Sequence, residues 1–315
     1  MKSMILDLRG NPGGLLDQGV KVADLFLDPG QEIVSTRGRA RGSSKTFADE
    51  ARQRWPSLPI VTLVNDGSAS AAEIIAGALQ DHDRSVLVGV PTFGKGLVQT
   101  LFPIADDVAL KLTTARWYTP SGRTIQRTAK DEEDQARQAA DDAVGKAPAD
   151  SIQRPVFHTD QGRVVQGGGG IVPDLVVHPD TFTTAEKDIV TAIGSHFSDF
   201  RDVLTSYALE LKNDKSITTE RFKVTPAMRQ TVLTRLRARG VKISDETYAS
   251  AASLIDEQLG YEIARYVFGR TAEFRRRSLD DPQLQTALQL LRKAQTPAEL
   301  LGLATARAGE ASARN

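Results

Sequence analysis

The organisation of this chain is set by one stretch, Val64-Asn65-Asp66-Gly67-Ser68-Ala69-Ser70-Ala71-Ala72-Glu73-Ile74. An apolar run from Ile60 to Val64 leads into it, which is typical of a buried strand. Small residues follow, and apolar residues then recur with helical spacing to about Gln80. The stretch therefore predicts a strand, a tight turn that carries Ser70, and a helix.

A second stretch supplies a chemical partner for Ser70. It reads Phe93-Gly94-Lys95-Gly96-Leu97-Val98-Gln99, and it places Lys95 25 residues after Ser70. A serine hydroxyl is a weak nucleophile until a base takes its proton, and a lysine does this in its neutral form, which burial favours. Apolar residues flank Lys95, and its glycine neighbours allow close backbone approach. We therefore predict that Ser70 is a nucleophile and Lys95 its base.

Further residues fit this chemistry. Gln99 lies four positions beyond Lys95, where its amide is suited to orient the lysine. Acyl transfer also needs hydrogen-bond donors for an oxyanion. The amide of Ala71, at the positive end of the predicted helix, is one candidate. Gly13 or Gly14, in a glycine-rich turn, supplies the second.

Each of these residues also has a purely structural interpretation. Ser70 or Ser68 alone is more simply the N-cap of the helix, and Glu73 its capping-box partner. Lys95 alone is more simply a surface lysine, and the two glycines a helix-entry turn. Only the joint pattern favours catalysis.

Composition excludes several other classes of protein and site. The 315 residues are 40% hydrophobic, which indicates a globular chain, and the 40 Lys and Arg residues balance 40 Asp and Glu. A net charge of zero gives no reason to expect nucleic acid as a partner. The chain has no cysteine and four scattered histidines, so we expect no metal site, and no apolar run reaches the ~20 residues of a membrane span.

Strands and helices alternate up to about residue 180, and only helices are predicted beyond it. This order predicts an α/β domain over 1–180, followed by an all-helical domain over 183–306. Within the first domain we predict a solvated loop over 37–54 and a charged insertion over about 129–150. In the second, long helices are expected over 188–211 and 247–277, and the tail 307–315 is expected to be disordered.

Five motifs in order resemble the C-terminal processing peptidases, also called tail-specific proteases. They span residues 4–178 and read Leu6-Asp7-Leu8-Arg9-Gly10-Asn11-Pro12-Gly13-Gly14-Leu15-Leu16, the Val64–Ile74 stretch, Gly94-Lys95-Gly96-Leu97-Val98-Gln99, Tyr118-Thr119-Pro120-Ser121-Gly122-Arg123 and Gly170-Ile171-Val172-Pro173-Asp174. Each motif is weak alone, whereas the five in order are specific.

The resemblance implies a serine endopeptidase with a crotonase/ClpP-like β-β-α core. It makes Ser70 the nucleophile, Lys95 the general base and Gln99 its orienting residue, with an oxyanion hole from Ala71 and the Gly13–Gly14 amides. It further implies protein or peptide substrates with accessible C-terminal tails, no metal or organic cofactor, and a periplasmic or other extracytoplasmic location.

The sequence also departs from the family pattern. The chain has no signal peptide and begins inside a predicted buried strand, so we expect an N-terminal truncation that removes a PDZ domain. A second hypothesis is therefore a catalytically impaired fragment that acts as an assembly module, with the helical region as a site of homo-oligomerisation. A third is a crotonase-like acyl-CoA enzyme, which uses an oxyanion hole without needing the Ser70–Lys95–Gln99 set.

Overall fold

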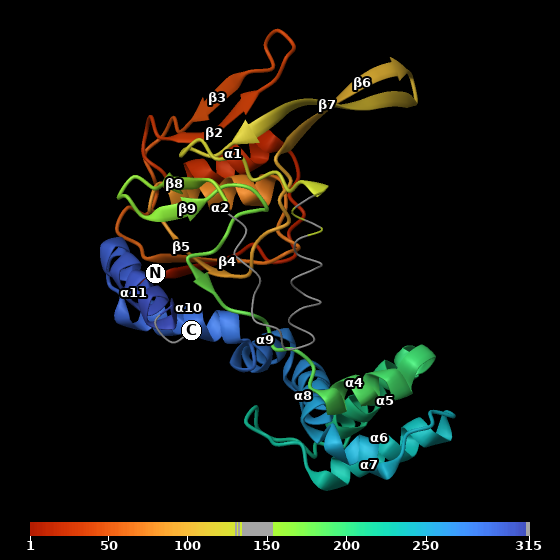
Figure 1. Cartoon of the computed structure of the whole chain (residues 1–315). Coiled ribbons are helices and arrows are strands. Elements are labelled where there is room, and N and C mark those ends of the chain that lie inside the picture. The colour runs from red at the N-terminus through yellow and green to blue at the C-terminus, as the bar shows by residue number, and fades with distance from the viewer. Residues whose placement is uncertain (130, 132, 134–153, 313–315) are drawn as a thin grey trace. The chain divides into compact units, whose positions relative to one another are not determined.

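A computed structural model describes residues 1–129, 131, 133 and 154–312 of the chain. The chain forms two compact units, one of Met1–His178 with Thr286–Asn315 and the other of Pro179–Gln285 (Figure 1). Most of the predicted insertion at 129–150 lies outside the described residues. The prediction of an α/β protein with a helical C-terminal region is confirmed.

The first unit contains a parallel sheet with strand order β1-β4-β5-β10. Its strands are β1 (Met4–Asp7), β4 (Ile60–Val64), β5 (Val86–Gly89) and β10 (Leu175–Val176). Every residue of β4 and β5 is buried, as expected for the centre of a parallel sheet that is covered on both faces. This explains why both strands are visible in the sequence as continuous apolar runs.

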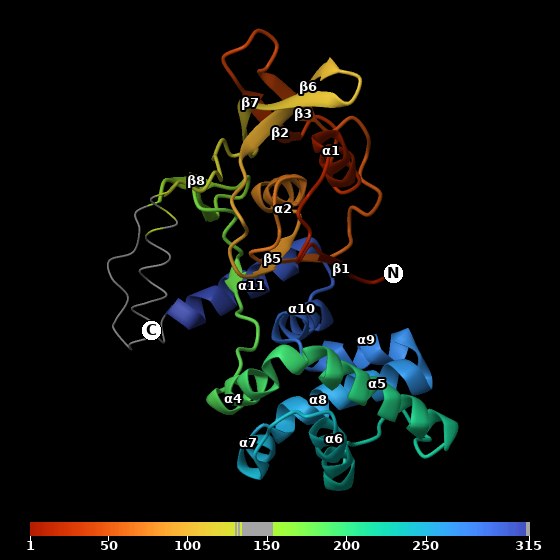
Figure 2. The ribbon, with the colours of Figure 1, turned by 90° about the vertical axis from the view of Figure 1, so that its right-hand side faces the viewer.

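A second, antiparallel sheet has the order β3-β2-β7-β6. It is formed by β2 (Glu32–Arg37), β3 (Lys45–Ala48), β6 (Leu97–Ala105) and β7 (Val108–Tyr118). Figure 2 shows the two sheets on either side of a helical layer. That layer consists of α1 (Leu16–Asp24) and α2 (Ala71–Asp81).

Close packing of these two helices requires a small residue. A side chain added at Gly19 of α1 would lie 3.1 Å from the Cβ atom of Ala71, so the first residue of α2 is packed directly against α1. The core around the helices includes fully buried Leu27, Ile33 and Leu79. The start of α2 is therefore fixed by its surroundings.

The first unit is completed by elements from both sides of the second unit in sequence. One of these elements is a hairpin of β8 (Val156–His158) and β9 (Val164–Gln166). The helices α10 (Pro282–Lys293) and α11 (Pro297–Ser312) follow the second unit in the chain, and α11 packs against β5 and β10.

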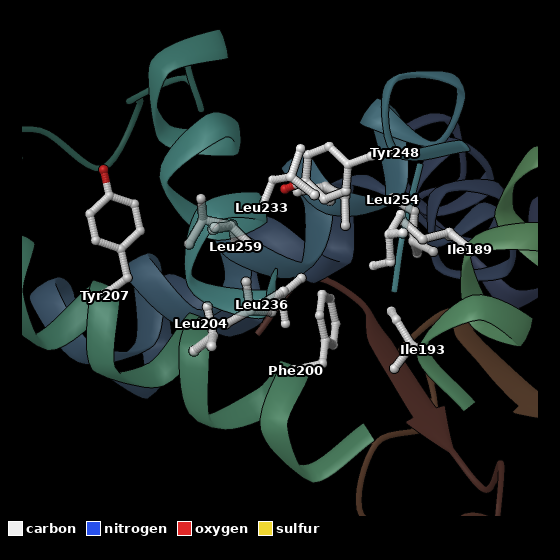
Figure 3. Close-up of a cluster of buried hydrophobic side chains, with 14 of the residues drawn as sticks. Ile189, Ile193, Phe200, Leu204, Tyr207, Leu233, Leu236, Tyr248, Leu254 and Leu259 are labelled. Atoms are coloured by element: carbon white, nitrogen blue, oxygen red, sulfur yellow. The ribbon is translucent and has the colours of Figure 1, made fainter. Parts of the chain in front are cut away.

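The second unit is entirely helical. Its elements are α4 (Thr184–Ile193), η1 (Gly194–His196), α5 (Phe197–Asn213), α6 (Pro226–Ala238), α7 (Asp245–Ser250), α8 (Ala252–Ile263), η2 (Ala264–Phe268) and α9 (Arg270–Leu279). They enclose an apolar core of their own, in which Phe200 and Leu204 from α5 lie with Leu236 from α6 (Figure 3). None of the helices that the structure describes combines the length and apolar character of a membrane span.

Three predictions about element boundaries differ from the structure. The predicted loop over 37–54 contains β3, which pairs with β2. The helix predicted over 188–211 is interrupted at Gly194, and the one over 247–277 at Ala251 and again at Gly269. The two glycines adopt φ values of +46° and +97°, which end a regular helix.

The C-terminal boundary also differs. The tail predicted to be disordered over 307–315 is helical as far as Ser312, where the described residues end. The helix α11 and the part of α10 from Thr286 onward belong to the first unit, whereas the sequence predicted one helical domain over 183–306. The physical reason is that buried residues of α11, such as Leu300 and Leu301, complete the packing of the first unit.

Candidate active site

Ser70 occupies the turn between β4 and α2 in a strained backbone conformation. Its φ and ψ angles are 55° and −116°, and such positive φ values are costly for a residue with a side chain. Its hydroxyl makes no hydrogen bond with any residue that the structure describes, so the side chain does not cap the helix. Strain of this kind is concentrated at functional sites, and a free hydroxyl is what a nucleophile needs.

Ser68 has the structural role in this turn. Its hydroxyl donates to the carbonyl oxygen of Leu8 at 2.7 Å and accepts from the amide of Asn65 at 3.0 Å. The Asn65 side chain in turn accepts from the amide of Gly10 at 2.8 Å. The Ser70 turn is thereby tied to the glycine-rich turn that follows β1.

The carboxylate of Glu73 joins the Ser70 turn to the Lys95 loop. One oxygen, Oε2, accepts from the amides of Ser70 at 2.8 Å and Lys95 at 2.9 Å. The other, Oε1, accepts from the hydroxyl of Thr92 at 2.5 Å and the amide of Gly94 at 2.7 Å. The predicted capping contact between Glu73 and the Ser70 amide is therefore present. It is one of four hydrogen bonds that the Glu73 carboxylate accepts.

Burial dominates the electrostatics of Glu73. The residue is fully buried, and removal from water raises the pKa of its carboxyl above the ordinary value, while the four hydrogen bonds act in the opposite direction. A buried carboxylate is costly unless its oxygens are bonded, and here both oxygens are bonded twice.

The backbone around Lys95 is held on both sides. The Lys95 carbonyl accepts from the indole nitrogen of Trp117 at 3.0 Å, and the carbonyl of Gly96 accepts from the Trp117 amide at 2.9 Å. Gly94 has a φ of +88°, and a side chain there would lie 2.9 Å from the Cβ atom of Arg127. The Lys95 side chain itself is half-buried.

The structure does not bring the three predicted catalytic side chains into hydrogen-bond contact. No such bond joins Ser70, Lys95 and Gln99 to one another, and Gln99 is exposed on β6, next to a register shift between Val98 and Gln99. What the fold does bring together is the backbone of Ser70 and that of Lys95, through one oxygen atom of Glu73. Catalytic hydrogen bonds are often loose without a substrate and tighten in the complex.

Gly13 lies directly against the start of α2. It adopts a φ of +86°, and a side chain there would come within 2.4 Å of the Ala69 oxygen and 2.6 Å of the Ala71 nitrogen. The Gly13 amide donates to the Asn11 side chain at 2.9 Å, so in this structure it is not free to bind an oxyanion. The role of Gly13 as an oxyanion donor stays a prediction, whereas the close approach to Ala71 shows that this position requires a glycine.

The amides of Ala71 and Gly14 are free. Neither donates a hydrogen bond to any described residue, and a side chain at Gly14 would meet no atom within 4 Å. The first turn of a helix leaves its amides without intrahelical partners, which accounts for Ala71. Of the predicted oxyanion donors, these two have available hydrogens.

A buried polar network behind α2 was missed by the sequence analysis. Arg123 is fully buried and donates to Asp81 at 2.6 Å and to the side chain of Gln80 at 2.7 Å. Asp81 also accepts from the amide of Ser121 at 3.0 Å. A sequence feature that points to this network is the Thr-Pro-Ser-Gly-Arg turn, in which Arg123 directly follows Gly122. In the structure this glycine has a positive φ.

The side chain of His82 is largely buried and hydrogen-bonded. Its side chain is 7% exposed, and its ring nitrogens lie 2.7 Å from an Asp160 oxygen and 2.7 Å from the Glu32 carbonyl oxygen. It therefore links three segments of the first unit. Among the described residues, no group of three or more acidic or histidine side chains is arranged to hold a metal ion.

The N-terminal part of the chain is similar to a known family of peptidases. Residues 1–133 match Peptidase family S41. The matched region contains Ser70, Glu73, Lys95 and the Gly13–Gly14 turn. This part of the chain is therefore related to the S41 peptidases.

Two relatives in sequence are named as carboxy-terminal processing proteases, in agreement with the match to a peptidase family. The carboxy-terminal-processing protease of Bartonella bacilliformis is 54% identical over 126 residues, which are 40% of this chain and 29% of that protein. The carboxy-terminal processing protease CtpA of Bacillus subtilis is 44% identical over 126 residues, 40% of this chain and 27% of that protein. The chain thus spans less than a third of the length of these relatives.

Among solved structures, the photosystem II D1 C-terminal processing protease is 28% identical. The match covers 62% of this chain and 39% of that one, with a TM-score of 0.39.

Proposed function

We propose that this chain carries the catalytic region of a serine peptidase that hydrolyses peptide bonds near the C-termini of proteins, with Ser70 and Lys95 as its catalytic dyad. The observation that carries the proposal is the conformation of Ser70, which is strained, leaves its hydroxyl unbonded and is tied to the Lys95 backbone by Glu73. The relation of residues 1–133 to peptidase family S41 supports the reaction class.

In the proposed mechanism, the Ser70 hydroxyl attacks the carbonyl carbon of the scissile peptide bond. The Lys95 amine, in its neutral form, takes the hydroxyl proton and passes it to the leaving amine, which departs as the acyl-enzyme ester forms. Lys95 then deprotonates a water molecule that hydrolyses this ester, which regenerates Ser70. Gln99 orients the lysine amine once substrate orders the site.

The negative charge that develops on the carbonyl oxygen is bound by backbone amides. The free amides of Ala71 and Gly14 are the proposed donors. The position of Ala71 at the first residue of α2 adds the favourable field of the helix N-terminus. Gly13 keeps this space open because a side chain there would overlap the Ala71 nitrogen.

The proposal extends to the fold and the setting of the reaction. We assign the first unit to the crotonase/ClpP-like folds, on the support of its parallel sheet covered by α2. The names of the relatives support substrates with accessible C-terminal tails. An extracytoplasmic site of action is part of the proposal and rests on the resemblance of the five sequence motifs alone. We further propose self-association through the helical second unit, because this unit exposes the apolar side chains of Phe197 and Phe274. Sedimentation equilibrium, which measures the mass of the protein in solution, tests this self-association.

Hydrolysis of tail peptides tests the dyad. Purified chain is incubated with a peptide library that has free C-termini, and the products are identified by mass spectrometry. We expect cleavage by the wild type, loss of cleavage in Ser70→Ala and Lys95→Ala, and a reduced rate in Gln99→Ala. The exposed residues Ser57 and Lys111 give matched controls, because Ser57→Ala and Lys111→Ala should cleave normally. Retained cleavage in Lys95→Ala would exclude lysine as the base.

A further inference from the structure

Two arginines lie opposite each other on neighbouring strands of the antiparallel sheet. Arg37 of β2 pairs with Arg116 of β7, and both side chains are exposed. Like charges in directly opposite positions destabilise a sheet. Neither arginine forms an ion pair with any residue that the structure describes, so no acidic partner within this part of the chain neutralises either charge.

Three more cations follow β2 in the chain, two on the loop that joins β2 to β3 and one at the first residue of β3. Arg39, Arg41 and Lys45 are exposed and, like the arginine pair, make no ion pair with the described residues. The loop is held in place, because the hydroxyl of Thr36 donates to the Ser43 carbonyl at 2.9 Å. A side chain at Gly38 would lie 2.4 Å from the Thr114 oxygen, so the loop packs directly on β7.

These five residues, Arg37, Arg39, Arg41, Lys45 and Arg116, are named the basic surface here. A pocket of about 370 Å³ opens beside them, lined by Arg37 and Lys45 and by the hydroxyl-bearing residues Ser35, Thr36, Ser44 and Thr46. Glu32 is the one acidic residue among those that line it. Hydroxyl and guanidinium donors in a pocket suit a carboxylate ligand.

The basic surface lies on the same sheet as the proposed catalytic lysine loop. Arg116 is flanked in register by Arg37 of β2 on one side and Leu97 of β6 on the other. Leu97 is the first residue of β6 and lies two residues after Lys95. Because neighbouring strands are about 4.8 Å apart, the row from Leu97 to Arg37 extends about 10 Å across the sheet. Leu97, at one end of this row, is thus close in sequence to the proposed catalytic lysine.

We propose that the basic surface binds acidic side chains of the polypeptide substrate on one side of the scissile bond. The inference rests on the proposed peptidase function and adds a substrate preference to it. The chain as a whole has zero net charge, so this local excess of positive charge is not a consequence of composition. The aromatic ring at this surface, Tyr118, is covered by the Arg37 guanidinium at 4.3 Å, which leaves no open ring for stacking of nucleic-acid bases.

Binding measured without catalysis tests the preference. The full chain with Ser70→Ala is titrated against a fluorescein-labelled peptide rich in Glu and against its Gln isostere, and anisotropy gives both Kd values. We expect the Glu peptide to bind about tenfold more tightly at low salt, and the difference to disappear at high salt. Arg37→Gln and Arg116→Gln should each weaken Glu-peptide binding about threefold, and together about tenfold.

Matched variants separate charge from fold. Arg37→Lys keeps the charge and should keep the preference. Arg201→Gln removes an exposed arginine from the second unit and should change neither Kd. Equal binding of the two peptides, or an undiminished preference in the double variant, would overturn the inference. Tighter binding of anionic vesicles or of an oligonucleotide than of the Glu peptide would also overturn it, in favour of those partners. Failure of the wild type to cleave peptides contradicts the proposed function and leaves these Kd values readable.

Discussion

The amides of Ser70 and Lys95 donate to the same oxygen atom, Oε2 of Glu73, at 2.8 and 2.9 Å. The two residues are 25 positions apart in sequence and lie in different loops, so the shared acceptor fixes the distance between their backbones. A proton transfer between their side chains depends on this separation. The catalytic proposal therefore makes Glu73 a positioning residue rather than only a helix cap.

Replacing Glu73 should damage both stability and activity. In Glu73→Gln the side-chain NH2 that replaces one carboxylate oxygen cannot accept hydrogen bonds, so two of the four donors lose their acceptor inside the core. We expect a loss of about 2–4 kcal/mol in the free energy of unfolding, measured in urea. Peptidase activity of the folded fraction should fall at least about tenfold. Unchanged activity in a destabilised variant would show that Glu73 serves the fold alone.

Adjacent glycines should respond differently to the same substitution. Gly13→Ala places a methyl group 2.6 Å from the Ala71 nitrogen at a φ of +86°, so we expect activity to be lost. Gly14→Ala meets no atom within 4 Å and keeps its amide, so activity should be largely retained. The two variants are compared in one hydrolysis assay. Similar activity in both would contradict the placement of Gly13 against the oxyanion site.

The buried pair of Arg123 and Asp81 should be important for stability. Arg123→Met leaves the Asp81 carboxylate buried without its charged partner, which typically costs about 3–5 kcal/mol. Arg237→Met provides a control, because Arg237 pairs with Asp245 at the surface of the second unit and such pairs contribute about 1 kcal/mol or less. Chemical denaturation measures both. A small change in the free energy of unfolding of Arg123→Met would mean that water enters the space left by Arg123 and solvates the Asp81 carboxylate.

Asp49 should make stability depend on pH. The residue is buried, its Oδ2 atom accepts no hydrogen bond from the described residues, and burial, aided by Asp24 and Asp28, raises its pKa to about 6. A raised folded-state pKa means that its stabilising contribution is fully present below the unfolded-state pKa of 3.8 and is lost as the pH rises through about 6.

Asp49→Asn tests this assignment, since it mimics the protonated acid at every pH. We expect the variant to be more stable than the wild type at pH 7.5, on the order of 1–3 kcal/mol, and equally stable near pH 4. Thermal unfolding at the two pH values measures the difference. If Asp49→Asn stabilises the protein by the same amount at both pH values, titration of Asp49 is ruled out as the cause of the stabilisation.

The sequence was sufficient to predict those elements whose signal is local. The apolar run of β4 and the small-residue turn before α2 each lie within a few consecutive residues, and the structure has them as predicted. Helix interruptions were missed because Gly194 and Gly269 are tolerated in a helical pattern, and only their positive φ values reveal the breaks. The short strand β3 was missed because four mostly exposed residues carry no apolar pattern.

The contacts of the site were beyond sequence reasoning for a different reason. Glu73 was identified as a capping-box partner from its spacing to Ser70, but its bonds to Thr92, Gly94 and Lys95 arise only when the two loops meet. Similarly, nothing in the glycine-rich turn indicates that Asn11 takes the Gly13 amide. The roles of Ser70, Lys95 and Gln99 as catalytic groups remain predictions.

Active-site labelling tests the central claim most directly. The wild-type chain is treated with a fluorophosphonate, which reacts with an activated serine, and the modified peptide is identified by mass spectrometry. The proposal predicts one adduct on Ser70, absent from Ser70→Ala and strongly reduced in Lys95→Ala, while Ser57→Ala reacts like the wild type. Labelling of Ser70→Ala to the same extent as the wild type would contradict it.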